Sequence, residues 1–169
     1  MPEYVTVAAF ERVARELMAA NVRYLVVGGL AVQAHGFDRA TYDVDLVIQL
    51  AAGNVENAFN ALDRATYKPL VPINSRQFSD PLTRAGLIRD KGMTVLNFWS
   101  EQFPATRLDI FVTEPFDFDA EYEAALLDHS LPGITLRFPR AETLLAMKRL
   151  AGRPKDQHDI LYLESLLNR

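Results

Sequence analysis

The most informative stretch of the chain runs from Gly28 to Asp45 and reads GGLAVQAHGFDRATYDVD. It follows the apolar run YLVV and leads into a second apolar run, LVI. Short apolar runs bounded by glycine and turn residues are typical of buried strands. We therefore expect strands over 22–27 and 44–50, joined by a short helix over 29–35 that opens at a glycine pair.

The two acids that end this stretch are spaced for one face of a strand. Side chains alternate along a strand, so Asp43 and Asp45 emerge together, a few ångströms apart. Two carboxylates held that close repel each other unless a cation lies between them. Hard oxygen ligands suit Mg²⁺, and a glycine turn that opens a helix can bind phosphate, so the stretch predicts nucleotide chemistry. The alternative is a solvated strand end that carries acids for solubility.

A third carboxylate is needed for two-metal phosphoryl transfer, and Asp109 is the best candidate. It lies in the run RLDIFV on a predicted strand over 106–113, on the same face as Arg107. An acid in such an apolar strand is costly unless it faces a site. A salt bridge to Arg107 or a strand-edge charge is the structural alternative. Asp117 and Asp119 precede a helix, where Asp most often caps, and are poorer candidates.

The turn before Asp43 holds two further candidates. Arg39 could bind phosphate oxygens bidentately, and Thr41 could contact the nucleotide or fix the turn through a local hydrogen bond. We expect His35 to be a packed residue at a helix end rather than a ligand.

A second polar cluster, KRLAGRPKDQHD at 148–159, joins two predicted helices over 141–151 and 155–167. Lys148, Lys155 and Asp156 in this cluster could help to bind a triphosphate tail. A solvated turn with capping residues explains the same pattern equally well.

The other predicted elements are helices over 5–20, 54–66, 80–89 and Asp117–Leu127, strands over 93–98 and 134–138, and a loop over 67–80. Strands and helices mix without regular βαβ repeats, which predicts an α/β (α+β) fold with a mixed sheet flanked by helices. We expect one domain over 1–169, with a core over 1–138 and a C-terminal helical pair over 139–169.

Composition limits the classes of function. The chain has 169 residues, a net charge of −4 and no cysteine. These values argue against an obligate polyanion-binding protein and exclude a disulfide framework or a cysteine nucleophile. No apolar run is long enough to span a bilayer, and the N-terminus lacks secretory-signal features, so we expect a soluble cytoplasmic protein without membrane contact.

The pattern Gly-Gly-x-Ala-x-x-x-His-Gly-x-x-Arg-x-Thr-x-Asp-x-Asp at 28–45 resembles the signature of the DNA polymerase β-like nucleotidyltransferases. It is most similar to the small prokaryotic branch of abortive-infection and toxin–antitoxin enzymes. Lys148 and the Arg-x-Lys-Asp motif at 153–156 match further motifs of that branch. The resemblance involves residues 22–48, 106–112 and 144–160, and is strongest in the first.

The resemblance implies a minimal nucleotidyltransferase fold and transfer of an NMP from an NTP. Asp43, Asp45 and Asp109 would bind two Mg²⁺ ions, for which Mn²⁺ can substitute. Backbone N–H groups at Gly28 and Gly29 would hold the phosphates. The acceptor hydroxyl would belong to a tRNA end, a protein or a small molecule such as an antibiotic, and a second copy or a partner protein could enclose it.

One departure from the family pattern is that many members carry Gly-Ser where this chain has Gly28-Gly29.

Two other functions compete with the enzyme. The first is a non-catalytic antitoxin or regulatory module that binds another protein, which the shortness of the chain favours. The second is a globular α/β protein whose acids are merely solvated.

Overall fold

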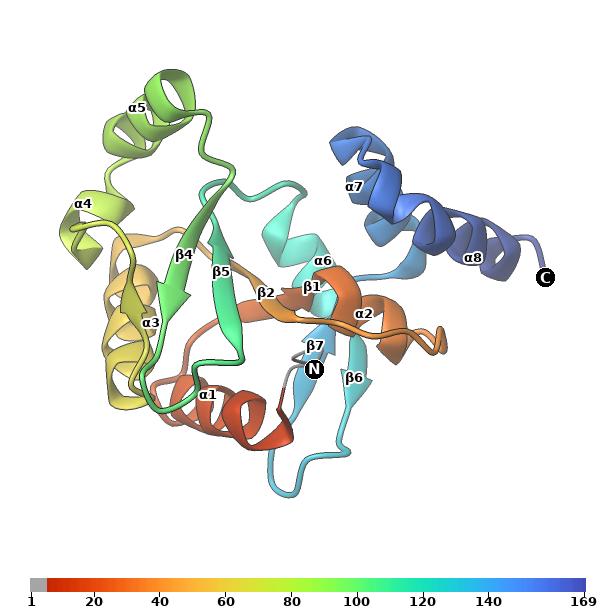
Figure 1. Cartoon of the computed structure of the whole chain (residues 1–169), viewed down its shortest axis with the longest axis horizontal. Coiled ribbons are helices and arrows are strands. Elements are labelled where there is room, and N and C mark those ends of the chain that lie inside the picture. The colour runs from red at the N-terminus through yellow and green to blue at the C-terminus, as the bar shows by residue number, and fades with distance from the viewer. Residues whose placement is uncertain (1–5) are drawn as a thin grey trace.

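The computed structural model describes residues 6–169 and contains a mixed sheet with helices packed around it (Figure 1). The helices of this part of the chain are α1 (Val7–Ala19), α2 (Gly28–Ala34), α3 (Ala52–Arg64), α4 (Ser75–Ser79), α5 (Pro81–Lys91), α6 (Phe118–Ala124), α7 (Ala141–Ala151) and α8 (Gln157–Leu167), with a 3₁₀ turn at Pro154–Asp156. The strands are β1 (Tyr24–Val27), β2 (Asp43–Ile48), β3 (Lys68–Pro69), β4 (Val95–Trp99), β5 (Arg107–Phe111), β6 (Leu126–Asp128) and β7 (Leu136–Phe138).

The main sheet has the strand order β1-β2-β5-β4-β3, and β6 and β7 form a separate hairpin. The β2–β5 pair is parallel and every other pair is antiparallel. The expectation of a mixed sheet flanked by helices is therefore confirmed. Its central parallel pair brings together two segments that lie more than 60 residues apart in the sequence.

One face of the sheet carries the hydrophobic core. Leu46, Leu108 and Phe98, on three neighbouring strands, are buried, and α1 and α3 supply Leu17 and Leu62. The period-2 pattern of β2, β4 and β5 leaves the opposite face for intermediate or exposed side chains. That opposite face carries the predicted carboxylates.

Three short elements differ from the sequence predictions. The segment 67–80 is not a plain loop, because it contains β3 and α4, and α4 begins with a capping box in which Asn74 and Gln77 exchange hydrogen bonds. The helix predicted over Asp117–Leu127 ends at Ala124, because the chain then extends to pair with β7.

Asp117 caps α6 through a bond from the Ala120 N–H, which confirms its expected role before a helix. Thr6 likewise caps α1 through a bond from the Ala9 N–H. Residue 5, which the prediction placed in the first helix, lies outside the described residues. No helix between residues 6 and 169 has both the length and the apolar character needed to cross a membrane.

Candidate active site

Three carboxylates lie on one face of the central strand pair. Asp45 and Asp109 are direct register partners across the parallel β2–β5 pair, and Asp43 is opposite Arg107. The burial of β2 and β5 alternates so that these four side chains share the face away from the core. The sheet therefore brings together all three carboxylates that the sequence suggested.

Two of the three carboxylates have protein partners. Arg107 Nε lies 3.1 Å from Asp43 Oδ1, and Asn97 Nδ2 donates to Asp109 Oδ1 at 2.5 Å. The salt bridge considered between Arg107 and Asp109 is thus formed with Asp43 instead. Within residues 6–169, no three His, Cys, Asp or Glu side chains converge closely enough to hold a metal ion directly.

The charges of these acids are strongly coupled. Burial, followed by the charges of Asp109 and Asp43, raises the pKa of Asp45 to about 7. Burial also raises the pKa of Asp109, against the lowering effect of the hydrogen bond from Asn97. Such mutual repulsion is relieved when a cation binds, and the donors are all hard oxygens. The donor set therefore fits Mg²⁺, provided that Asp43 and Asp109 turn from their present partners.

The glycine turn is in direct contact with the site. A Cβ at Gly28 would lie 2.1 Å from Asp45 Oδ2, and its φ is +69°, so only glycine fits there. A Cβ at Gly29 would lie 2.6 Å from Thr41 Oγ1. The departure from Gly-Ser therefore has a local cause, because the Thr41 side chain occupies the space that a serine at position 29 would need.

The C-terminal cluster combines an exposed turn over residues 151–155 with a buried ion-pair network on its inner side. Lys148 Nζ lies 3.1 Å from Asp156 Oδ1 and 3.0 Å from Asp159 Oδ2, and all three side chains are buried. Arg153 pairs with Asp156 at 2.7 Å, and Arg39 pairs with Asp159. Burial acts to raise the pKa of Asp156, but hydrogen bonds from Arg153 and Lys148 lower it overall.

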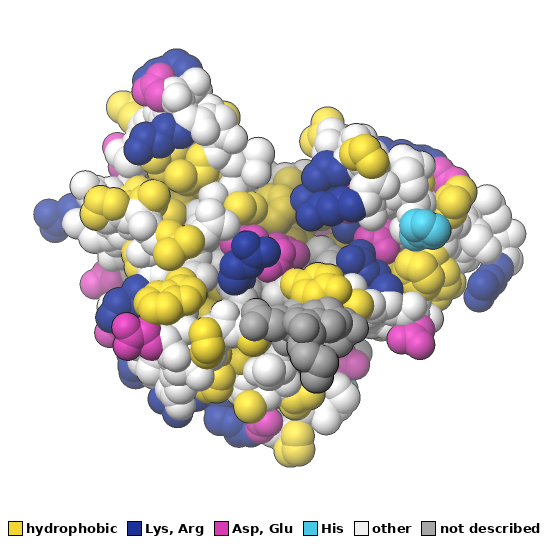
Figure 2. Space-filling view, in the orientation of Figure 1, with side chains coloured by type: hydrophobic (Ala, Val, Ile, Leu, Met, Phe, Trp, Pro, Cys, Tyr) yellow, Lys and Arg dark blue, Asp and Glu magenta, His cyan; other side chains and the backbone are white. Residues whose placement is uncertain are grey.

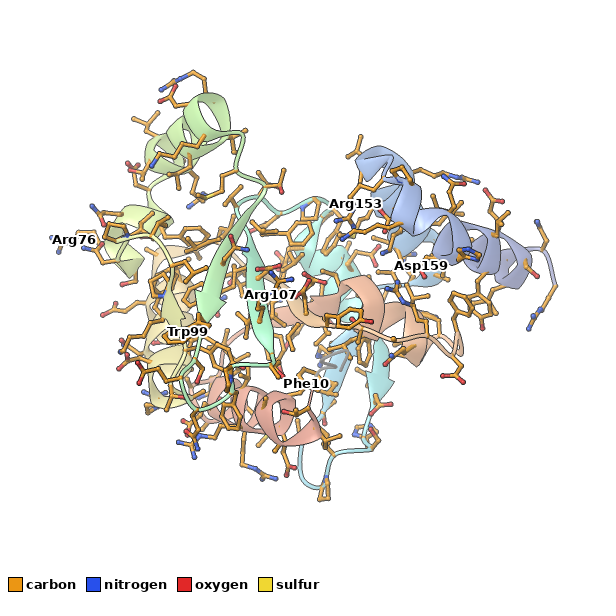
Figure 3. The ribbon with its side chains drawn as sticks, viewed as in Figure 1. Phe10, Arg76, Trp99, Arg107, Arg153 and Asp159 are labelled. Atoms are coloured by element: carbon orange, nitrogen blue, oxygen red, sulfur yellow. The ribbon has the colours of Figure 1, made fainter. Side chains whose placement is uncertain are left out.

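This network joins α7 and α8 to the turn before β2, since Arg39 belongs to that turn (Figure 3). The structure thus brings three predicted residues into one cluster, namely Arg39, Lys148 and Asp156. Asp159 joins Arg39 to Lys148. The positive charges of Lys148 and Arg153 also act on Asp45, and that of Lys155 acts on Asp109. Lys155 forms no ion pair with any described residue, so its ammonium is available to a ligand.

Figure 2 shows acidic side chains at the floor of a hollow between the lobe of α5 and the lobe of α7 and α8. Basic side chains border the hollow on the α7 side, where Figure 3 labels Arg153. The hollow thus places carboxylates and cations opposite each other, an arrangement that suits a metal-bound polyphosphate.

His35 has the structural role that was expected. Its Nε2 lies 2.8 Å from the Pro139 carbonyl oxygen, and its own carbonyl accepts a hydrogen bond from Tyr162 Oη at 2.7 Å. Phe37 stacks on the same Tyr162 ring. These contacts attach the end of α2 to the C-terminal helices and leave the imidazole away from the carboxylates.

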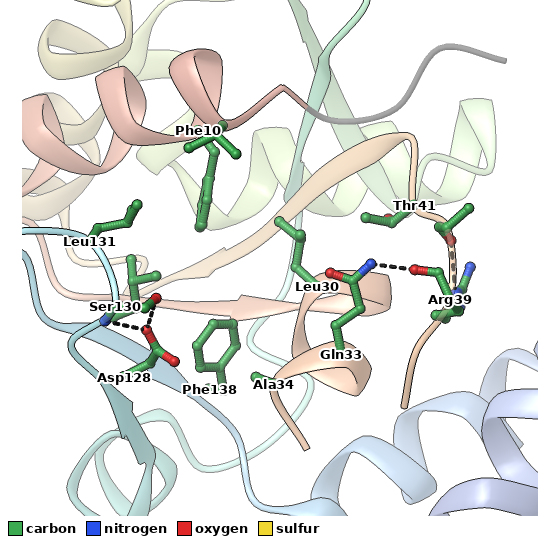
Figure 4. Close-up of a pocket in the computed structure, with 13 residues that line it drawn as sticks. Phe10, Leu30, Gln33, Ala34, Arg39, Thr41, Asp128, Ser130, Leu131 and Phe138 are labelled. Carbon is green, nitrogen blue, oxygen red and sulfur yellow. Dashed lines mark hydrogen bonds between the residues drawn. The ribbon is translucent and has the colours of Figure 1, made fainter. Parts of the chain in front are cut away.

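A separate pocket of about 500 Å³ lies between α1, α2 and the β6–β7 hairpin (Figure 4). Phe10, Leu30 and Phe138 line it, with Arg39 and Thr41 at one side. None of the three carboxylates borders it, so this pocket is distinct from the candidate active site.

Sequence analysis missed two members of the site. Asn97 was not singled out, although its alternation with Leu96 and Phe98 places it on the open face. Asp159, in the helix predicted over 155–167, was not singled out either, although it is buried and joins Arg39 to Lys148. Its position three residues after Asp156, on one side of α8, was the available signal.

Comparison with known proteins defines the class of fold. No protein-family model matches the sequence, and no curated protein matches it. Among solved structures, the chain is similar to nucleotidyltransferases over nearly its whole length. The chain therefore has the nucleotidyltransferase fold, as the motif at 28–45 predicted.

Two particular structures carry this conclusion. One is lincosamide antibiotic adenylyltransferase LnuA bound to lincomycin, with 16% identity, a TM-score of 0.59, and coverage of 96% of this chain and 99% of that one. The other is an antigenic nucleotidyltransferase-like protein from Paracoccidioides brasiliensis, with 19% identity, a TM-score of 0.54, and coverage of 95% and 74%. At such identities the likeness establishes the fold.

Proposed function

We propose that this protein is an Mg²⁺-dependent nucleotidyltransferase that transfers an NMP from an NTP to an acceptor hydroxyl. The observation that carries the proposal is the register of Asp45 with Asp109, with Asp43 on the same face and Gly28 in contact with Asp45. A solvated strand end would not explain why the half-buried Asp45 packs against a glycine that cannot be replaced.

Asp43, Asp45 and Asp109 are the residues that would hold two Mg²⁺ ions, with Mn²⁺ as a substitute. Bound there, the ions would neutralise phosphate charge and lower the pKa of the acceptor hydroxyl. Arg107 and Asn97, which now contact Asp43 and Asp109, would lose these contacts as the carboxylates turn.

Other residues of the hollow would bind the triphosphate. Backbone N–H groups at Gly28 and Gly29 would face the phosphates, and the Thr41 hydroxyl, 2.6 Å from where a Cβ at position 29 would lie, would stand in for a serine hydroxyl. Lys155, which forms no ion pair with any residue from 6 to 169, would supply a cation. Lys148, Asp156 and Arg39 act as positioning residues, because their charged ends are held in the buried ion-pair network.

The proposed reaction is a displacement at the α-phosphorus of the NTP. The acceptor oxygen forms a bond to the α-phosphorus, the bond from that phosphorus to the β-bridging oxygen breaks, and pyrophosphate leaves. The proton of the acceptor hydroxyl passes to Asp109 or to solvent. Asp109 is a candidate for this role because it is the carboxylate on the strand nearest the open part of the sheet.

For the acceptor, we propose a small hydroxylated compound in preference to a tRNA end or a protein. The similar structure of the same length is an adenylyltransferase of a small antibiotic. The net charge of −4 gives little support for binding a polyanion.

The direct experiment incubates the protein with α-labelled NTPs, Mg²⁺ and cell extract. Wild type should transfer label to an acceptor and release pyrophosphate, and Asp45→Asn should reduce the rate by at least about 10³-fold. Asp38→Asn, at an exposed acid in the preceding turn, serves as the matched control. Equal labelling by wild type and Asp45→Asn would contradict the proposal.

A non-catalytic protein-binding module, such as an antitoxin, is the second candidate. The contacts of Arg107 with Asp43 and of Asn97 with Asp109 favour it, because they satisfy two carboxylates without a metal. This reading predicts a partner protein that co-purifies equally with wild type and Asp45→Asn. It also predicts no Mg²⁺-dependent nucleotide binding by either protein.

A further inference from the structure

The sheet continues as an open surface beyond the carboxylates. On the face away from the core, β5 and β4 are exposed at Arg107, Asn97 and Trp99. No helix lies in front of these strands in Figure 1, and Figure 3 shows Trp99 and Arg107 on this same side. We call the surface formed by Lys68, Leu70, Asn97, Trp99 and Arg107 the open sheet face.

The strand register arranges the open sheet face in two rows. Trp99 pairs with Lys68, and the β4–β5 register, continued by one residue, places Trp99 opposite Arg107. Asn97 lies in the adjacent row, directly opposite Asp109. Both rows therefore run from the carboxylates across β5 and β4 towards β3.

We propose that the open sheet face binds the acceptor, and that the Trp99 indole is the platform on which a ring of the acceptor stacks. This inference rests on the proposed function and adds the acceptor subsite to it. Trp99, the last residue of β4, is 42% exposed, and Leu70, two residues after the Lys68 that faces it, is 63% exposed. Large apolar side chains exposed next to a candidate reaction site are typical of ligand-binding surfaces.

Strand geometry sets the size of the acceptor. Trp99 lies one strand over and two residues along from Asp109, which corresponds to about 8 Å between the Cα atoms of these two residues. One sugar or heterocyclic ring that carries a hydroxyl spans such a distance. The Asn97 amide lies between the two ends and can bond a polar group on the ring.

The charges favour a neutral or cationic compound over a nucleic acid strand. The two cations of the open sheet face are already paired, Arg107 with Asp43 and Lys68 with Asp63. With Asp45 and Asp109 beside them, this region carries more acids than bases. A phosphate backbone needs several free Lys or Arg side chains, which this surface does not offer among the described residues.

The test separates the low-mass and macromolecular fractions of a cell extract and offers each to the protein with α-labelled NTPs and Mg²⁺. Label should enter a product of the low-mass fraction. Trp99→Ala should raise at least 10-fold the amount of that fraction needed for half-maximal labelling, and Trp99→Phe should restore most of the loss. Leu161→Ala, at an exposed apolar residue of α8, is the matched control.

A parallel thermal-shift measurement with Mg²⁺ and a non-hydrolysable NTP distinguishes failure of the acceptor subsite from failure of the proposed function. An equal shift in wild type and Trp99→Ala supports the inference, because the substitution then spares the nucleotide site. Three outcomes would overturn the acceptor subsite alone. They are label found only in RNA or protein, labelling that Trp99→Ala does not change, and no low-mass product although the thermal shift is normal. Absence of both shift and label would overturn the proposed function with it.

Since Trp99 is the only tryptophan of the chain, its fluorescence reports on this surface without interference. Quenching of its emission by acrylamide should fall when the low-mass fraction is added together with Mg²⁺ and the NTP analogue. Unchanged quenching under conditions that give low-mass product would contradict stacking on Trp99.

Discussion

At the residue scale, the contact between Gly28 and Asp45 is the tightest constraint in the site. A Cβ at position 28 would meet Asp45 Oδ2 at 2.1 Å in a backbone with φ of +69°. Gly92 has a similar φ of +59° with nothing within 4 Å of a Cβ. Substitutions at these two glycines can therefore distinguish the cost of backbone strain from the cost of a clash with the Asp45 carboxylate.

We expect Gly92→Ala to lose about 1 kcal/mol of unfolding free energy, from backbone strain alone. Gly28→Ala should lose at least about 1 kcal/mol more, and should also abolish Mg²⁺-dependent NTP binding because Asp45 is displaced. Urea unfolding and calorimetric NTP titration measure the two effects. Equal stability of the two variants with normal NTP binding would contradict the assigned contact.

The pKa of Asp45 gives a pH prediction for the metal-free protein. A folded-state pKa of about 7, against an ordinary value of 3.8, means that the folded state retains a proton that the unfolded state has lost between these pH values. The unfolding free energy should therefore fall by roughly 3–4 kcal/mol as the pH rises from 4 to 8. Asp45→Asn should remove most of this slope, as measured by urea unfolding in EDTA, whereas Asp38→Asn should keep it.

The sequence predicted the residues of this site better than it predicted their contacts. Alternation along strands is a local property, so the shared face of Asp43 and Asp45 followed from the spacing alone. The partners Asn97 and Arg107 depend on the strand order β2-β5-β4 and its register, which local patterns do not encode. The steric conflict at Gly29 likewise required the position of Thr41.

At the element scale, α7 and α8 are fixed to the turn before β2 by the buried ion pairs around Lys148. Lys148 contacts both Asp156 and Asp159, which are almost fully buried. Removing one partner of such a cluster leaves buried charge without compensation. The network therefore makes the position of the C-terminal helices depend on a few charged groups.

Lys148→Met should accordingly destabilise the protein by about 3 kcal/mol in urea unfolding. Arg149→Ala, which removes an exposed ion pair with Glu164 from the same helix, should cost less than about 1 kcal/mol. A Lys148→Met variant as stable as Arg149→Ala would show that the buried ion pairs do not hold the two helices in place.

The short elements were the least predictable. β3 has only two residues and includes Pro69, so no periodic pattern identifies it. The strand β6 follows α6 after one residue, and a continuous apolar pattern obscured the change from helix to strand. By contrast, the Asn74 and Gln77 spacing of α4 is a capping-box signal that was present in the sequence.

At the scale of the whole molecule, two different surfaces flank the carboxylates. The α7–α8 side contributes cations, and the open sheet face contributes Trp99 and Asn97. Under the proposed function, the NTP would bind on one side of Asp45 and Asp109 and the acceptor on the other.

Nucleotide binding should raise the stability of the whole chain. With Mg²⁺ and a non-hydrolysable NTP at about 100 times its Kd, the expected gain is about 2.7 kcal/mol, equivalent to several degrees in Tm. Asp45→Asn should lose this gain, as should wild type in EDTA. An unchanged Tm in all conditions would favour the reading in which the acids are merely solvated.

Binding of metal by the three carboxylates can be tested by diffraction from crystals soaked with Mn²⁺ and a non-hydrolysable NTP, recorded at the manganese absorption edge. We expect an anomalous peak within coordination distance of Asp45 and Asp109, with Asp43 turned away from Arg107. An NTP-soaked crystal without such a peak, in which the contacts of Asp43 with Arg107 and of Asp109 with Asn97 are intact, would contradict this expectation.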